Sequence, residues 1–504
     1  MASFTGGAGN DTFTGNDEND TIRGNAGNDV FDGGNGSDLI YGNLGDDAIT
    51  GNQSAGTVTT PQNGLDTVYG GQGNDSIDYT APGAGGAFGG AGAGGAVLAY
   101  GNFGNDIMYG GAAADRLYGG QGNDSIRGGA GADTIFGGQG EDSLIGGAGA
   151  DVVYGNLGND TIRVDSATSG TDTVYGGQGN DSIDYSASIL TGNAANTDAA
   201  RLFGNLGNDT ILGSSGGDYL SGGDGNDQLD GGLGSDIIYG NQGNDSIVGS
   251  DATATGTISD TVFGGQGDDT VSYAGVTGGA VTTALIYGNL GNDSLTGGVN
   301  ADTLYGGQGN DTLTGGAGAD SLFGGTGNDS ILGGDGDDLV NGGAGVDTLT
   351  GGASRVAGTA GSAGATAVSS NDTFAFAAGD TGTTSSTIDT ISDFVSNRAP
   401  TGTQGTDLSV AGENDAIRFI GGPAVSGTNY AEVALANGAT GFDAATTAAQ
   451  ALISAGNAYA FVADSVGSNG YVFADTNGDK TIDAAVRLTG VSTLAGFDSS
   501  DIVA

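Results

Sequence analysis

Residues Gly119–Ile126 read GGQGNDSI, and the same spacing returns at Gly306–Leu313 (GGQGNDTL) and Gly324–Ile331 (GGTGNDSI). The nine-residue unit is G-G-x-G-x-D-x-U-x, where U is a large aliphatic residue, and it runs through most of the chain. Its glycine-rich part predicts a tight turn with several positive φ angles. The residues that follow predict a short strand whose middle side chain points inward.

Two such units make one coil of about 18 residues, and stacked coils place their strands in two parallel sheets. We therefore predict an all-β chain that folds as a right-handed parallel β-roll. Its core is a thin stack of one Ile, Leu or Val per strand. Because such a core buries little apolar surface, apolar burial alone does not offset the entropy lost on folding.

Composition limits the function. The chain has 504 residues, 109 glycines, no cysteine, no histidine and a formal net charge of −50. This charge repels nucleic acid and favours cations as partners. Without His or Cys, the Ser–His–Asp, Cys–His and H-E-x-x-H arrangements are impossible, and Gly213–Gly217 matches G-x-S-x-G only as a repeat turn. We expect no enzyme, and no catalytic domain ahead of the repeats; polysaccharide cleavage by paired carboxylates is the alternative.

The turns alternate between two kinds. One kind reads mostly GGQGND or GNLGND, and the kind between reads GGAGAD at Gly128, Gly146 and Gly315. With two units per coil, each kind lines one edge of the roll: a first edge and a second edge. Extra residues replace turns of the second edge only, and predict six protruding loops at Thr50–Leu65, Thr80–Val97, Val164–Thr171, Ser186–Ala200, Gly249–Ser259 and Ala274–Ala284.

The loops recur in order. Three blocks, starting at Asp38, Asp151 and Asp236, share the same succession of turns and insertions. This regularity indicates either a repeated purpose for the loops or recent duplication that carried them along.

Each turn ends in Asp, and stacked coils about 4.8 Å apart place these carboxylates in line. Without a cation the carboxylates repel one another. Ca²⁺ takes six to eight hard oxygens from carboxylates and backbone carbonyls, and glycine-rich turns leave the carbonyls unobstructed. The predicted ligands on the first edge are Asp11, Asp29, Asp47, Asp75, Asp106, Asp124, Asp142, Asp160, Asp181, Asp209, Asp227, Asp245, Asp269, Asp293, Asp311, Asp329 and Asp347. Those on the second edge are Asp38, Asp133, Asp151, Asp236, Asp302, Asp320 and Asp338.

The second edge also offers Asp20, Asp115 and Asp218. The turns GNDEND at Gly15 and GAAADR at Gly111 depart from the pattern, and no calcium is assigned there.

Over roughly Gly6–Gly352 the nonapeptides resemble the RTX (repeats-in-toxin) calcium-binding family. The resemblance implies that each Ca²⁺ lies between consecutive turns of one edge, held by Asp carboxylates and loop carbonyls. Carried onto both edges, it implies about two dozen ions, which would offset the negative charge. It also implies folding coupled to calcium outside a calcium-poor cytosol.

Aromatic residues occupy the last strand position before most first-edge turns, from Tyr41 to Phe323. That position points outward, so we predict an aromatic ladder along one sheet. In-register stacking that stiffens the roll is one interpretation; a contact stripe for a neighbouring molecule is the other.

The nine-residue repeat ends after Gly352. We divide the chain into a roll (1–352), a linker or long turn (353–370) and a C-terminal cap (371–504). Within the cap we predict a helix at Phe442–Ala455 and a hairpin turn at the D-T-N-G-D stretch from Asp475. The cap resembles the C-terminal domain of RTX proteins exported by type I secretion, at Asn371–Phe376, Thr387–Phe394 and Tyr471–Val491. The resemblance implies an export signal at this end, and we identify neither an N-terminal signal peptide nor a transmembrane segment.

We therefore expect a secreted, calcium-binding structural protein at or outside a bacterial surface, which assembles with itself into a surface layer or extracellular matrix. The alternative is an adhesin or carbohydrate-binding module that binds surface polysaccharide through its loops. An ice-binding roll needs a flat outward array of Thr, whereas the outward positions here mix Ser, Thr, Arg, Tyr and Asp. A truncated exoprotein whose catalytic part lies in another gene product is a further alternative.

Overall fold

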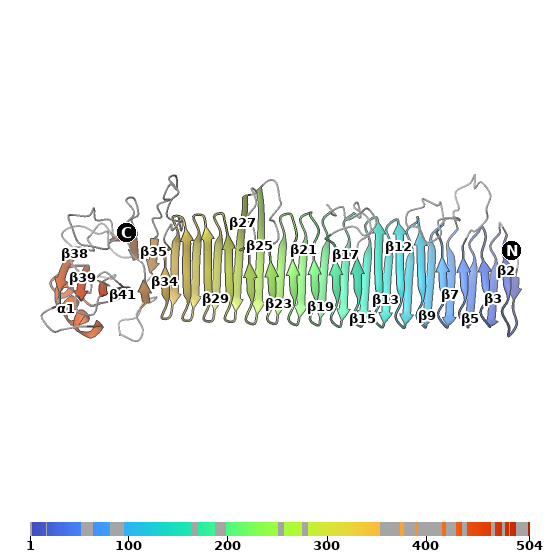
Figure 1. Ribbon diagram of the computed structural model, residues 1–504, viewed down its shortest axis with the longest axis horizontal. Helices are drawn as coiled ribbons and strands as arrows, with labels where there is room; N and C mark the ends of the chain where they lie inside the picture. Colours follow the sequence, from blue (N-terminus) through green and yellow to red (C-terminus); the bar gives the residue numbers. More distant parts are fainter. Residues whose placement is uncertain are drawn as a thin grey trace, which may run out of the picture. The chain divides into compact units, whose positions relative to one another are not determined.

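A computed structural model describes most of the roll and the main elements behind it. The described residues are 3–16, 18–51, 64–80, 95–163, 170–186, 198–249, 257–274, 281–352, 373–376, 389–391, 416–419, 430–435, 441–464, 469–475, 479–482, 484–489 and 502–503. The chain divides into two compact units, Met1–Ser246 and Ile247–Ala504. In each unit successive strands lie side by side as rungs (Figure 1).

The first unit holds two parallel sheets. One contains β1 (Ser3–Thr5), β3 (Thr21–Ala26), β5 (Leu39–Leu44), β7 (Asp66–Gln72), β9 (Val97–Phe103), β11 (Arg116–Gln121), β13 (Thr134–Gln139), β15 (Val152–Leu157), β17 (Thr173–Gln178), β19 (Arg201–Leu206), β21 (Tyr219–Asp224) and β23 (Ile237–Gln242). The other contains β2 (Thr12–Thr14), β4 (Val30–Asp32), β6 (Ala48–Thr50), β8 (Ser76–Asp78), β10 (Ile107–Gly111), β12 (Ser125–Ala130), β14 (Ser143–Ala148), β16 (Thr161–Arg163), β18 (Ser182–Asp184), β20 (Thr210–Leu212) and β22 (Gln228–Asp230). First-edge turns lead from the first sheet to the second, and second-edge turns lead back.

The second unit begins with the same arrangement. Its first sheet contains β25 (Thr257–Gln266), β27 (Val281–Leu290), β29 (Thr303–Gln308), β31 (Ser321–Thr326) and β33 (Leu339–Ala344). Its second sheet contains β26 (Thr270–Ser272), β28 (Ser294–Gly298), β30 (Thr312–Ala317), β32 (Ser330–Asp335) and β34 (Thr348–Thr350). Strand β24 (Ser246–Val248) spans the point where the first unit ends and the second begins.

The core is the thin stack that the repeat predicts. The middle residue of each short strand is buried, and residues of successive coils stand opposite one another; Leu117 lies opposite Ile135 in the pair β11–β13, and Ile126 opposite Leu144 in β12–β14. The exposure of all four side chains is 0–1 %. The predicted parallel β-roll is confirmed, and most strands contribute one aliphatic side chain to its interior, with Phe31 in that place in β4.

The strands after Gly352 continue both sheets. In the first, β35 (Thr373–Phe376) pairs with β33, then β37 (Ala416–Phe419) and β42 (Ile502–Val503) follow. In the second, β36 (Asp389–Ile391) pairs with β34 and with β41 (Ala484–Thr489). Antiparallel pairs join β41 to β40 (Asn469–Ala474) and β40 to β39 (Tyr459–Asp464), and β38 (Tyr430–Ala434) runs parallel to β39. The predicted hairpin therefore lies between β40 and β41, whereas the predicted linker 353–370 lies outside the described residues.

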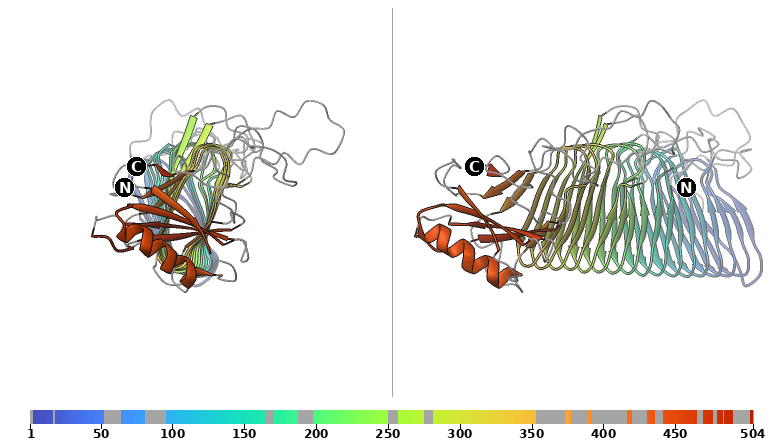
Figure 2. Two further views of the ribbon diagram at one scale, coloured as in Figure 1. Left: turned by 90° about the vertical axis from the view of Figure 1, so that its left-hand side faces the viewer. Right: turned by 60° about the vertical axis from the view of Figure 1, so that its left-hand side comes forward.

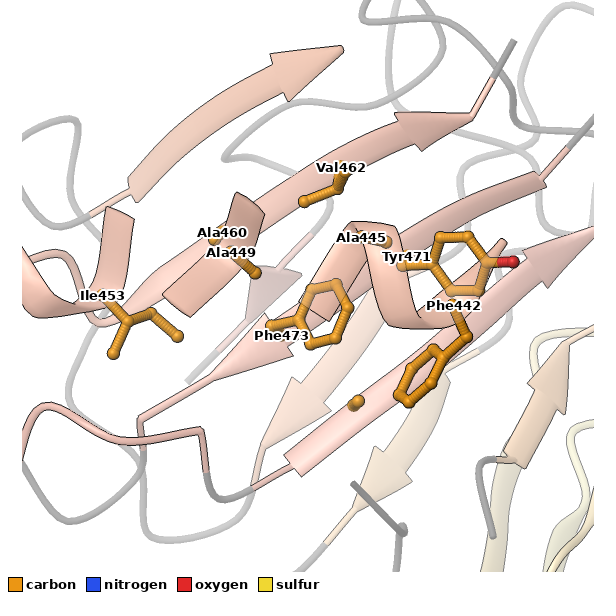
Figure 3. Close-up of a cluster of buried hydrophobic side chains, with 9 residues drawn as sticks. Phe442, Ala445, Ala449, Ile453, Ala460, Val462, Tyr471 and Phe473 are labelled. Carbon is orange, nitrogen blue, oxygen red and sulfur yellow. The ribbon is translucent and has the colours of Figure 1, made fainter. Parts of the chain in front are cut away.

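Helix α1 (Phe442–Ser454) forms where it is predicted. Glycines with positive φ flank it, Gly441 at 83° and Gly456 at 104°. Its buried face packs on side chains from β39, β40 and β41 (Figure 3) and consists of Phe442, Ala445, Ala449 and Ile453. Figure 2 shows the helix and these strands from two further directions. No helix in the described part of the chain is both long and apolar enough to cross a membrane.

Candidate metal sites

The first-edge turns have one repeated backbone conformation. From the turn at Gly24 onward, the second and fourth residues have positive φ, for example 120° at Gly120 and 124° at Gly122. Some turns carry Asn at the second position, as at Asn102 with φ 78°. Asn is among the few residues with a side chain that adopt this region readily, and this explains why GN alternates with GG in the sequence.

The fourth position of the turn also lies against the coil before it. A Cβ atom on Gly140 would overlap the backbone of Gly122, with its carbonyl carbon only 2.6 Å away. Gly9 occupies the same position in the first turn, and nothing lies within 4 Å of its Cβ position.

We predict that Gly140→Ala destabilises the roll and that Gly9→Ala does not. The first substitution combines positive-φ strain of about 1–3 kcal/mol with a backbone clash between coils. Thermal unfolding at saturating calcium measures the difference. Equal unfolding temperatures for the two variants would contradict the predicted coil contact.

The aspartates at the turn ends form continuous ladders. On the first edge, the backbone N–H of each Asp donates to Oδ1 of the Asp in the next coil, at 2.8 Å from Asp106 to Asp124 and from Asp124 to Asp142. In the first unit this ladder runs from Asp11 to Asp245. In the second unit it joins Asp269, Asp293, Asp311, Asp329, Asp347 and Asp389. The predicted alignment of carboxylates is thus present.

The other carboxylate oxygen, Oδ2, faces a small space between two coils. At Gly110 the position of an added Cβ lies 2.5 Å from Asp115 Oδ2 and 2.5 Å from the carbonyl oxygen of Gly128 in the next coil. The same two kinds of oxygen surround the first glycine of most turns on both edges. We call this space the cradle. It exists because glycine carries no side chain there.

Many of these Oδ2 atoms are buried and accept no hydrogen bond. They belong to Asp29, Asp38, Asp47, Asp75, Asp106, Asp115, Asp124, Asp133, Asp142, Asp160, Asp181, Asp209, Asp227, Asp293, Asp302, Asp311, Asp320 and Asp329. A buried carboxylate oxygen without a partner is costly, and a cation in the cradle would satisfy it. No three carboxylates converge within the described part of the chain, so carbonyl oxygens must complete any ligand set. Hard oxygens of mixed origin suit Ca²⁺.

Burial raises the pKa of most of these carboxyl groups, because the charged form loses its hydration. The pKa rises from 3.8 to about 7 for Asp75 and Asp124, and to about 8 for Asp133. The backbone hydrogen bond from the preceding coil lowers each pKa, and neighbouring aspartates raise it again. Without a cation, these carboxyl groups therefore take up protons at a higher pH than an exposed Asp does.

This shift predicts a pH dependence. A carboxyl group whose pKa is higher in the folded chain than in the unfolded chain stabilises the calcium-free fold. This stabilisation is complete at a pH below the pKa of the unfolded chain, and it is lost as the pH rises through the folded pKa of about 6–8. In calcium-free buffer, acidification from about pH 8 to pH 5 should therefore increase β-structure. In calcium, the same acidification should raise the calcium concentration needed for folding, since protons compete for the ligands. Circular dichroism across this range measures both effects; calcium requirements that do not change with pH would contradict them.

The second edge carries a ladder that the sequence spacing hides. Residues 66, 172 and 260 also close its connections: Asp38 donates to Oδ1 of Asp66 at 2.7 Å, and Asp151 to that of Asp172 at 2.8 Å. These aspartates and Asp389 were not among the predicted ligands. The insertions shift Asp66, Asp172 and Asp260 out of the repeat spacing, but the D-T-V sequence that each of them begins is a signal that could have found them.

Asp218 differs from the other second-edge aspartates. The hydroxyl of Ser214 donates to its carboxylate at 2.9 Å (Oδ2), and the Ser214 backbone N–H donates to the same oxygen at 2.6 Å. Ser214 stands where most turns have their second glycine. Its hydrogen bonds take up the oxygen that elsewhere faces the cradle.

The six predicted loops lie largely outside the described residues, which end at residues 51, 80, 163, 186, 249 and 274 and resume at 64, 95, 170, 198, 257 and 281. Their described ends connect second-sheet strands to first-sheet strands, as expected for insertions at the second edge.

The aromatic ladder is present in both units. Rings stack at centroid distances of 4.7–5.1 Å from Tyr41 to Phe203, and again from Phe263 to Phe323. Ser221 interrupts the sequence pattern, and Tyr219 fills the gap with rings tilted by 44° and 40° to its neighbours. Inside each stack both faces of a ring are covered by other rings, so the ladder presents ring edges.

Comparison with known families agrees with this geometry. The family model of the RTX calcium-binding nonapeptide repeat matches residues 5–40, 24–58, 62–80, 92–126, 100–135, 127–162, 166–187, 196–229, 203–238, 221–252, 256–275, 285–313 and 314–349. Together these matches cover more than half of the chain. A search of curated proteins found no match.

Proposed function

Because the chain belongs to the RTX calcium-binding nonapeptide repeat family, we propose that it is a secreted structural protein whose roll folds on calcium and then assembles into a bacterial surface layer or extracellular matrix. The observation that carries the calcium part is the column of buried Oδ2 atoms without hydrogen-bond partners, most of which face a carbonyl oxygen across the cradle. Calcium would supply the positive charge and the coordination that these oxygens lack.

The proposed ligands are the aligned turn aspartates and the carbonyl oxygens of the first glycines. In the middle of the first unit, Asp106, Asp124 and Asp142 would hold calcium between their coils together with carbonyls such as those of Gly119 and Gly137. Ion binding at successive coils would neutralise much of the formal charge of −50. This neutralisation removes the repulsion that opposes both folding and contact between copies of the chain.

Assembly is supported by the regularity of the surface. The three blocks repeat their insertions in the same order, and the aromatic ladder offers a run of stacked ring edges in each unit. A carbohydrate-binding role gains no support from the ladder, because sugars stack on ring faces and these faces are already covered. No catalytic role is proposed, since the chain has neither His nor Cys.

Negative-stain electron microscopy of the full chain tests the assembly. Calcium at millimolar concentration should produce sheets, tubes or fibres, and a chelator should dissolve them. Calcium-folded particles that remain single would contradict the assembly, and would favour an adhesin that acts through the six insertions.

A further inference from the structure

Three buried tyrosines occupy the second edge, one in each block. Tyr79, Tyr185 and Tyr273 follow directly on the strands β8, β18 and β26, and their exposures are 5 %, 1 % and 1 %. The backbone N–H of each donates to a carbonyl of the next coil, for example Tyr79 to Tyr109 at 2.9 Å and Tyr273 to Thr296 at 3.0 Å. Each tyrosine therefore stands where an ordinary turn has its first glycine.

The ring of each described example fills the cradle of the coil before it. In an ordinary turn, such as Gly33–Asp38, the Cβ position of the first glycine lies 2.7 Å from Oδ2 of the turn's own Asp. At Gly51 and Gly249 the same position instead lies against the ring carbons of Tyr79 and Tyr273. An aromatic ring thus takes the space that elsewhere lies between a carboxylate oxygen and a carbonyl oxygen.

The hydroxyl groups meet the aspartates that close these connections. Tyr273 donates to Oδ2 of Asp260 at 3.0 Å, and both residues are buried. The hydroxyl of Tyr79 is buried and makes no hydrogen bond of normal geometry, but Tyr79 lowers the pKa of Asp66, which burial raises to about 6.

Tyr185 lowers the pKa of Asp172, which burial raises to about 8. In all three blocks the pair consists of a tyrosine and the Asp of the preceding coil.

A second substitution accompanies each tyrosine. The connection that begins at Tyr79 ends at Val97 in place of Asp, and those that begin at Tyr185 and Tyr273 end at Ala200 and Ala284. The backbone N–H groups of these residues donate to Asp115, Asp218 and Asp302, as an Asp at the same position would. The glycine that opens the cradle and the carboxylate that lines it are therefore lost together.

We propose that these tyrosine–aspartate pairs are calcium-free clamps that replace metal ions at three places on the second edge. The clamps divide the second-edge calcium column into segments, whereas the first-edge column has an Asp in every turn. Each clamp fixes the base of one inserted connection by the packing of a buried ring, supported at Tyr273 by a hydrogen bond to Asp260, so that this base does not depend on the calcium concentration. The inference rests on the proposed calcium binding, and it identifies three places on the second edge where calcium does not bind.

Two matched triple variants of the full chain test the clamps. One carries Asp66→Asn, Asp172→Asn and Asp260→Asn; the control carries Asp38→Asn, Asp133→Asn and Asp320→Asn, in ordinary turns of the same edge. Equilibrium dialysis with elemental analysis counts the bound calcium. We expect the clamp variant to bind as many ions as the unchanged chain, and the control to lose at least one ion per substituted turn.

A third variant, Tyr79→Phe with Tyr185→Phe and Tyr273→Phe, removes only the hydroxyls. It should keep the calcium count and unfold at a lower temperature in saturating calcium. If the clamp variant loses as many ions as the control, the proposal that the clamps bind no calcium is wrong, while the proposed function stands. If the unchanged chain binds no calcium, the proposed function itself fails.

Discussion

Removing calcium is expected to abolish the β-structure of the roll. The core supplies one aliphatic side chain per short strand, which is too little apolar burial to offset the ordering of a glycine-rich chain. The buried aspartates of both ladders add repulsion once they ionise, because each lies next to the carboxylates of the neighbouring coils. Far-UV circular dichroism with excess chelator should show a largely unfolded chain, and calcium should restore the β signal.

Magnesium provides the control for this experiment. Mg²⁺ keeps its waters and demands a rigid octahedron, so the same concentration of magnesium should restore little β-structure. An unchanged β signal in chelator would show that the fold does not need the metal.

Neutralising one carboxylate in the middle of the first-edge ladder should have the second-largest effect. In Asp142→Asn the amide keeps the shape of the side chain but cannot supply a charged oxygen to the cradle. Asp142 is buried, its Oδ2 has no hydrogen-bond partner, and its Oδ1 accepts the N–H of Asp124. We expect a loss of about 3 kcal/mol in stability at saturating calcium, and a several-fold higher calcium concentration at the folding midpoint.

The matched control is Glu141→Gln, the same chemical change one residue earlier in the same turn. Glu141 is exposed, so its substitution should leave the calcium midpoint nearly unchanged. Calcium titrations followed by circular dichroism compare the two variants. Equal shifts would mean that general surface charge, and not the cradle, sets the calcium requirement.

Much of this architecture follows from spacing alone. The nine-residue period fixes which residue of each strand is buried, so the interior positions of Ile126 and Leu144, the outward ladder that includes Tyr118 and the turn conformations are all predictable. The helix at Phe442 is predictable because flanking glycines delimit an alanine-rich segment. These features depend on local sequence, and the stacking of coils repeats them.

The remaining features depend on contacts between coils that differ in length. Asp66 joins the second-edge ladder only through register with the coils on either side, and the insertion before it removes the spacing that would reveal this. Tyr79 could not be placed from the sequence, since the repeat assigns an outward position to tyrosines inside a strand, such as Tyr118, whereas Tyr79 follows its strand at a position where most turns have glycine. The first-edge ladder extends to Asp389 because the C-terminal strands continue the sheets, although their sequence has left the repeat.

The most direct test of calcium binding in the cradles is an anomalous difference map from crystals of the calcium-loaded protein. The account predicts a row of peaks along the first edge, one between each pair of consecutive coils, next to Oδ2 of residues such as Asp106, Asp124 and Asp142. It also predicts peaks at the ordinary turns of the second edge. Peaks confined to exposed carboxylates, with the cradles empty, would contradict it.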